Sequence, residues 1–277
     1  MRQEPRIVLL TGSERRHRYA ATAVAERTAV VGIVTEEGGL LALGTSSSPE
    51  DRETIRQHLA ERDAVEARML GRSSAWPPTA RLQLPLGGVN QPEGIAWVRK
   101  RRPEVVVLFG ASVIQEPLLQ LFGGRIVNVH LGLSPYYRGS GTNFWPLVER
   151  KPECVGATIH LAVAQVDGGP ILGQIRPKTD AHDRAHDVGT KAIVAAFRVL
   201  PIVLRRYLDG GLPPVRQDLT DGRVFRSGAF NAAAVRQLWA NFEAGMMQEY
   251  VRDAEVRCRA YPIVPVANER EIRGRDE

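Results

Sequence analysis

The chain has 277 residues, of which 43% are hydrophobic, and this is enough to bury a sizeable core in one α/β domain with an appendage. Its two cysteines, Cys154 and Cys258, lie far apart, which excludes a disulfide framework or a cysteine-rich metal cluster and favours a cytoplasmic setting. The formal charge of +6 is spread over separate basic stretches, so nucleic acid is not the expected partner, and no apolar run reaches the roughly 18 residues that span a membrane.

In the first half of the chain, apolar strand-like runs alternate with helical patterns. Ser48 and Pro49 mark one helix start, because serine caps a first turn and proline fits the first helical position. We expect strands at 6–12, 29–37, 104–110 and 124–130, and helices at 15–27, 48–70, 92–102 and 116–122. This alternation predicts βαβ units, and hence an α/β fold whose mostly parallel sheet is flanked by helices.

The pattern changes in the second half. Residues 155–177 are expected to form two extended runs that are joined at 167–169, and a long helix follows at 186–208, interrupted or kinked at Pro201. A glycine- and proline-rich boundary then precedes a tail with one convincing helix at 230–251. We therefore predict a domain at 1–210 and a small C-terminal extension at 211–277.

A pair of polar residues begins at the carboxyl end of an expected strand, where open α/β sheets bind their ligands. Asn128 and His130 are two residues apart, so they point to the same side of an extended strand. An amide and an imidazole that converge can donate hydrogen bonds to an oxyanion that develops at a carbonyl. Asp167, in a glycine-flanked turn, is the candidate acid that orients the imidazole. From residue types alone, ordinary hydrogen bonding at a strand end remains an alternative interpretation.

Two other polar clusters have both a structural and a functional interpretation. Arg15, Arg16 and Arg18 lie where a strand runs into a helix start, so they are either solvated or in contact with an anionic group such as a phosphate. His182 and His186 are four residues apart, which on a helix suits a metal ion, but a solvated helix entry is the expected role and no metal is predicted.

Three spaced motifs resemble those of the formyltransferase family that uses 10-formyltetrahydrofolate. They occur in the family's order, and the resemblance covers residues 1 to about 205. Their residues are Asn128, Val129 and His130 with Pro135, Tyr137, Arg138 and Gly139; then Gly156 to His160; then Asp167 to Ile171 with Gln174.

The resemblance implies a Rossmann-like formyltransferase fold, with 10-formyltetrahydrofolate as formyl donor and a small-molecule amine as acceptor. It implies that Asn128 and protonated His130 stabilise the tetrahedral oxyanion, while Asp167 supports His130 and proton movement. By the same mapping, the donor lies against Gly110, Ser112, Val113, Ile114, Ala162 and Val166, and the acceptor against Arg15, Arg16, Ser134, Tyr137 and Arg138.

Departures from the family pattern narrow the acceptor. Gly132 stands where the family usually has serine, with Ser134 nearby as another hydroxyl. Residues 11–19 lack the glycine-rich phosphate loop of the purine enzyme, which disfavours glycinamide ribonucleotide. The tail after 211 is short for the tRNA-binding barrel of a methionyl-tRNA formyltransferase, which disfavours initiator tRNA. An amino sugar, free or nucleotide-linked, is the expected acceptor, and another small specialised amine is the alternative.

Two other functions and one assembly question stay open. Water in place of the amine would make a formyltetrahydrofolate deformylase, and loss of turnover would leave a binding module for anions or RNA. The retained polar trio argues against the binding module. On the tail helix, an apolar face either folds back on its own domain or joins a homodimer. This face comprises Leu238, Trp239, Phe242, Met246 and Met247.

Overall fold

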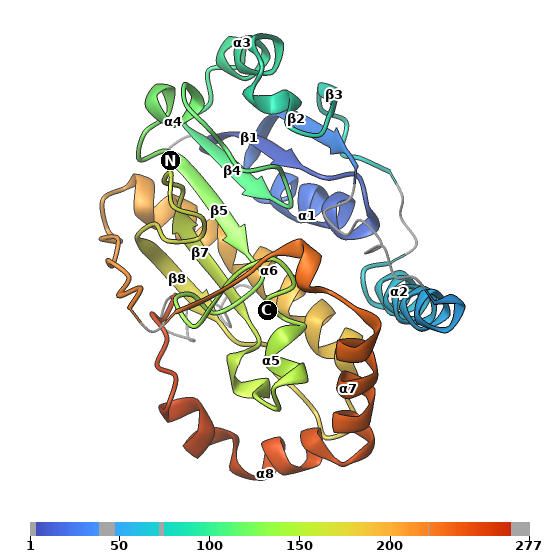
Figure 1. Cartoon of the computed structure of the whole chain (residues 1–277). Helices are drawn as coiled ribbons and strands as arrows, with labels where there is room; N and C mark the ends of the chain where they lie inside the picture. The colour runs from blue at the N-terminus through green and yellow to red at the C-terminus, as the bar shows by residue number, and fades with distance from the viewer. Residues whose placement is uncertain (1–3, 39–47, 72–74, 221, 267–277) are drawn as a thin grey trace.

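A seven-stranded sheet forms the centre of the computed structural model, which describes residues 4–38, 48–71, 75–220 and 222–266 (Figure 1). The strand order is β3-β2-β1-β4-β5-β7-β8. The first five strands in this order are parallel to one another, whereas β7 and β8 are antiparallel to their neighbours. The strands are β1 (Arg6–Thr11), β2 (Ala29–Glu37), β3 (Arg81–Pro85), β4 (Val105–Phe109), β5 (Ile126–His130), β7 (Ala157–Leu161) and β8 (Ile171–Ile175). The predicted mostly parallel sheet is confirmed.

Helices cover both faces of this sheet. At the start of α2, the Ser48 hydroxyl accepts a hydrogen bond from the Asp51 N–H at 3.0 Å, as the capping pattern predicts. The helix α6 continues through Pro201. The helices are α1 (Arg15–Ala25), α2 (Pro49–Met69), α3 (Pro92–Lys100), α4 (Leu118–Leu121), α5 (Trp145–Val148), α6 (Ala185–Leu208), α7 (Ala232–Glu243) and α8 (Met246–Arg259), with short 3-10 turns η1 (Gly88–Asn90), η2 (Pro152–Cys154) and η3 (Ser227–Ala229).

The core has a layer on each face of the sheet. Alternate residues of β1 enter different layers: Ile7 and Leu9 pack with α1 and α6, whereas Val8 and Leu10 pack with η1, α3 and α4. Burial on both faces explains why the strands read as continuous apolar runs. Because helices cover both faces of the sheet, polar side chains gather at the carboxyl ends of the strands.

The expectation of one helix at 230–251 is wrong. Gly245 adopts a left-handed φ of 78° and divides the segment into α7 and α8. Leu238, Met246 and Met247 are buried in a third cluster together with residues of α5 and α6, and Phe242 packs against it, so these four residues of the apolar face fold back on this chain. The homodimer remains a prediction.

A two-stranded sheet that the sequence did not reveal joins the tail to the motif region. Its strands are β6 (Tyr137–Gly139) and β9 (Arg223–Phe225), which pair in parallel. The Phe225 ring stacks on Tyr137, with centroids 5.8 Å apart and planes at 6°. The predicted boundary between a domain at 1–210 and an extension at 211–277 stays a prediction, since the tail packs closely on residues that precede this boundary. Within the described part of the chain, no helix is long and apolar enough to cross a membrane.

Candidate active site

The structure brings Asn128, His130 and Asp167 together. The two β5 residues approach the Asp167 carboxylate from one side: Asn128 Nδ2 donates to Oδ1 at 3.1 Å, and His130 Nδ1 lies 3.2 Å from Oδ2. Asp167 lies in the loop that follows β7, and this loop carries it back over the end of β5. A residue 37 positions beyond His130 thus becomes its direct partner, which the sequence motif alone did not establish.

A fourth polar residue, His160, belongs to this cluster. Antiparallel pairing places His160 opposite Asn128. Its Nδ1 donates to the Leu161 carbonyl at 2.9 Å, which leaves Nε2 to accept from Asn128 Nδ2 at 3.1 Å. Both N–H bonds of the Asn128 amide therefore have partners within the chain. The sequence contained His160 in a matched motif but gave it no role.

The charges within the cluster follow from its contacts. Burial alone would raise the pKa of Asp167, but the charge of His130 and the Gly139 N–H at 2.9 Å hold it well below its usual value. Burial lowers the pKa of His130 below its usual value, and the opposing effects of Asp167 and the Tyr137 carbonyl offset only part of this shift. Both His130 nitrogens face oxygen atoms, because Nε2 lies 3.0 Å from the Tyr137 carbonyl oxygen. Only the protonated imidazolium can donate to both.

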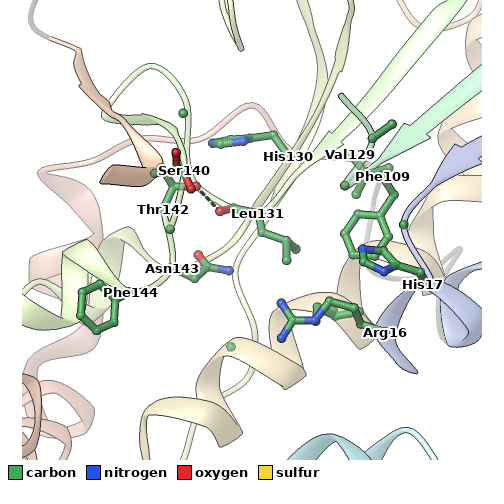
Figure 2. Close-up of a pocket in the computed structure, with 18 of the residues that line it drawn as sticks. Arg16, His17, Phe109, Val129, His130, Leu131, Ser140, Thr142, Asn143 and Phe144 are labelled. Carbon is green, nitrogen blue, oxygen red and sulfur yellow. Dashed lines mark hydrogen bonds between the residues drawn. The ribbon is translucent and has the colours of Figure 1, made fainter. Parts of the chain in front are cut away.

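The cluster lies on the wall of a cavity of about 730 Å³. Figure 2 shows His130 and Leu131 on one side of it and Arg16 and His17, from α1, on the other. The volume is within the range of small-molecule sites. All six residues expected to contact the folate line this cavity: Gly110, Ser112, Val113, Ile114, Ala162 and Val166.

Most residues expected to contact the acceptor do not reach the cavity. Ser134 and Tyr137 are buried, and the Tyr137 hydroxyl donates to Glu149 at 2.6 Å. Arg138 is buried beside Gly222, outside the lining. The structure thus gives these three side chains partners or burial outside the cavity, and their contact with the acceptor stays a prediction.

The expected phosphate contact at the start of α1 also changes. Arg15 donates to the Gly71 carbonyl at 3.1 Å and does not line the cavity. Arg16 does line it, but its guanidinium pairs with the buried Glu66. This cation is therefore neutralised by the chain itself.

Space explains the glycine that replaces the usual serine of the motif. A Cβ added at Gly132 would lie 2.6 Å from Thr142 Cβ and 2.7 Å from His130 Nε2, closer than real contacts allow. Thr142 occupies that space and donates its hydroxyl to the Leu131 carbonyl (Figure 2). In this chain, the hydroxyl next to His130 therefore comes from Thr142, a residue that sequence reasoning missed.

A cluster of rings forms another part of the cavity wall. The His58 and His186 rings, from α2 and α6, have centroids 4.4 Å apart. Phe144 and Phe230 contact His58 at centroid distances of 5.6 and 5.9 Å. His186 therefore packs against the ring of His58, while His182 is exposed. Among the described residues there is no group of three or more side chains that could hold a metal ion.

These histidines predict that the protein loses stability in mild acid. Burial, followed by the charge of Arg62, lowers the pKa of His58 to about 4, and burial lowers those of His17 and His186 to about 3. Below pH 6.5 the unfolded chain binds protons that the folded chain does not, so the free energy of unfolding falls as the pH drops toward 4. The melting temperature should fall between about pH 7 and about pH 4.5, and less steeply in His58→Phe. Parallel curves for the two proteins would contradict this origin.

The fold and the site define an α/β protein with a polar ligand site at the carboxyl ends of its parallel strands. Residues 25–204 match the profile of the family described as formyl transferase. The chain therefore belongs to the formyltransferase family.

Curated relatives and solved structures are similar to this chain. It is 32% identical to the phosphoribosylglycinamide formyltransferase of Escherichia coli K12 over 111 residues, which is 40% of this chain and 52% of the relative, so the match spans about half of that protein's length. An N-formyltransferase from Helicobacter canadensis, in complex with folinic acid and dTDP-3-aminofucose, has a TM-score of 0.54 at 12% identity, covering 85% of this chain and 80% of its own. A glycinamide ribonucleotide transformylase from Symbiobacterium toebii has a TM-score of 0.53 at 18% identity, covering 78% and 95%. At these identities the structural neighbours show the fold.

Proposed function

We propose that this protein transfers the formyl group of 10-formyltetrahydrofolate to the amine of an amino sugar or of another small metabolite. The observation that carries this proposal is the contact of Asn128 and His130 with the buried carboxylate of Asp167 on the wall of a ligand-sized cavity. Two further observations support it: the chain belongs to the formyltransferase family, and the residues expected to contact the folate line the same cavity. In the proposed reaction, the formyl donor 10-formyltetrahydrofolate is a substrate.

The reaction begins with attack of the acceptor amine on the formyl carbon, which places negative charge on the formyl oxygen. Asn128 and protonated His130 are the donors that would bind this oxyanion, and Asp167 orients His130 and favours its protonated form. The tetrahedral intermediate collapses by breaking the bond between the formyl carbon and the folate nitrogen. The proton lost by the amine passes to that nitrogen, with Asp167 as the adjacent base.

The existing hydrogen bonds indicate how the oxyanion is selected over the neutral formyl group. Asn128 Nδ2 already donates to His160, and His130 Nε2 faces the Tyr137 carbonyl. The formyl oxygen has to replace these acceptors. A charged oxygen accepts a stronger hydrogen bond than a neutral one, so the exchange favours the transition state over the bound substrate.

Two polar side chains hold the loop that is expected to contact the donor. The buried Glu36 carboxylate accepts from the Ser112 N–H at 2.7 Å, the Ser112 hydroxyl at 2.9 Å and the Val89 N–H at 3.2 Å. Asn90 donates to the Val113 carbonyl at 3.0 Å and accepts from the Gln115 N–H at 2.8 Å. The loop shape is therefore set by one residue at the carboxyl end of β2 and one residue that follows β3.

Glu36→Gln is expected to raise KM for the donor roughly tenfold, with kcat and the acceptor KM close to those of the wild type. The amide nitrogen cannot accept from Ser112, so one charge-assisted hydrogen bond to the loop is lost, worth about 1.5 kcal/mol. Steady-state kinetics in both substrates measure the split. Glu37→Gln, at the exposed next position, is the matched control. An unchanged donor KM in Glu36→Gln would refute the role given to this loop.

The test of the proposed function is the release of tetrahydrofolate from 10-formyltetrahydrofolate, with and without a panel of amines. Release that depends on an amine supports the transferase. Release that is the same without any amine indicates a deformylase, and no release in any mixture refutes the proposal.

A further inference from the structure

We propose that the part of the cavity bounded by His58, His186, Asn143, Phe144 and Phe230, here called the ring chamber, binds an uncharged ring that carries hydroxyl groups. This inference rests on the proposed function, and it names the part of the acceptor that the chain recognises. The phosphate of a nucleotide-linked acceptor would lie outside the ring chamber.

The apolar walls of the ring chamber come from segments that are distant in sequence. Phe144 and Phe230 have ring centroids 5.2 Å apart, and both contact His58. His186 completes the group from the start of α6. All four rings line the cavity. Flat ring faces of this kind pack against the C–H faces of another ring.

Unpartnered polar atoms accompany these rings. Among the described residues that line the cavity, four buried side-chain atoms have no hydrogen-bond partner: His58 Nδ1, His186 Nε2, Asn143 Nδ2 and Arg16 Nε, the last of which belongs to the guanidinium that pairs with Glu66. His58 is only 5% exposed. Figure 2 shows Asn143 among the side chains around the cavity, and its Oδ1 is already held by the Gly156 N–H at 3.0 Å. Buried polar atoms without partners are rare in folded proteins, so three of them on residues of the ring chamber point to a ligand.

Hydroxyl groups fit these three atoms better than other ligand groups. A neutral imidazole nitrogen is a donor or an acceptor depending on its tautomer, and a hydroxyl can pair with either. A hydroxyl oxygen can also accept from Asn143 Nδ2, which only donates. A ring with several hydroxyl groups therefore satisfies all three atoms and places its C–H faces on the phenylalanines.

The charges around the ring chamber disfavour a phosphate. Arg16 pairs with Glu66, and Arg62 lies 3.6 Å from Glu14 and 3.1 Å from Asp63, so the nearby guanidinium groups already have carboxylate partners. Burial keeps the two histidines neutral at physiological pH. An anion would thus lose its hydration without meeting a free cation.

The ring chamber is continuous with the proposed reaction centre. The loop from Gly139 to Phe144 begins with the Gly139 N–H on the Asp167 carboxylate and ends with Asn143 and Phe144 in the chamber wall. An amine on the bound ring is thus directed along this loop toward Asp167. The tail of the chain contributes Phe230, so the chamber depends on the C-terminal extension.

Histidine ring resonances provide a direct test that does not depend on turnover. The full chain, labelled with ¹⁵N-histidine, is titrated with 2-amino, 3-amino and 4-amino deoxyhexoses, and separately with inorganic phosphate. At least one sugar should shift the ¹⁵N resonances of the His58 and His186 ring nitrogens and leave the resonances of the exposed His182 unchanged. The proposal is overturned if no sugar shifts them, or if phosphate shifts them as strongly.

A matched pair of variants tests specificity. His58→Phe keeps a ring and removes the ring nitrogens. Because one hydrogen bond to the sugar is lost, KM for the accepted sugar should rise about fivefold to tenfold. The kcat and the KM for the formyl donor should stay at their wild-type values. His182→Phe is the control and should behave as wild type. An unchanged acceptor KM in His58→Phe overturns the proposal. If the sugar shifts the His58 and His186 resonances but no formyl transfer occurs, the ring chamber is supported and the proposed function is refuted. The failure of one proposal can therefore be distinguished from the failure of the other.

Discussion

Asp167→Asn is expected to lower kcat by about 10²-fold to 10⁴-fold while the protein stays folded. The Asp167 carboxylate accepts from Asn128 and from the Gly139 N–H, and it faces His130. An asparagine side chain has one accepting oxygen, so it cannot serve these three neighbours together. It also removes the negative charge that favours the imidazolium.

Single-turnover kinetics with circular dichroism check this result. Asp218→Asn removes a carboxylate that is fully exposed, and should keep wild-type kcat. Combined with His130→Ala, Asp167→Asn should cost little more than either change alone, because the two residues act as a unit. A kcat for Asp167→Asn within about threefold of wild type would remove Asp167 from the mechanism.

Gly139→Ala is expected to impair both stability and turnover. Gly139 has a left-handed φ of 92°, and an added Cβ would overlap the Phe225 carbonyl oxygen of β9. Strain at such a position costs more than about 1 kcal/mol of unfolding free energy. Since the Gly139 N–H also binds Asp167, any shift of β6 reaches the reaction centre.

Denaturant unfolding and kcat, measured together, check this second result. Gly228→Ala is the control, because a Cβ at Gly228 meets nothing within 4 Å and its φ is not left-handed. We expect Gly139→Ala to lose at least tenfold in kcat even at temperatures at which it remains folded. Wild-type stability and kcat would show that β9 does not support the site.

The regular elements could be predicted from sequence because their signals are local. The apolar strand residues 105–109 and the Ser48 cap of α2 depend only on neighbouring residues. The pairing of β6 with β9 has no such signal, because each strand has three residues and is stabilised by a partner about 85 positions away. The split at Gly245 was missed because the apolar pattern continues across it.

The site shows the same division between local and long-range information. The spacing of Asn128 and His130 indicates a common side of one strand, and the motif order points to Asp167. Asp167 itself adopts a left-handed φ of 48°, which aspartate tolerates better than most residues but which no pattern announces. His58 gave no signal, since it lies in a charged helix and enters the cavity wall only through the packing of α2 near α6. The partner of Arg15, the Gly71 carbonyl, could not be predicted for the same reason, because it is 56 residues away in the sequence.

The central claim is tested most directly by following the formyl carbon itself. The protein is incubated with 10-[¹³C]formyltetrahydrofolate and a panel of free and nucleotide-linked amino sugars, and the products are analysed by mass spectrometry. The account predicts that one acceptor gains a single labelled formyl group in equal amount to the tetrahydrofolate released, and that Asp167→Asn nearly abolishes both products. Labelled formate without a formylated amine, or no consumption of the donor at all, would contradict it.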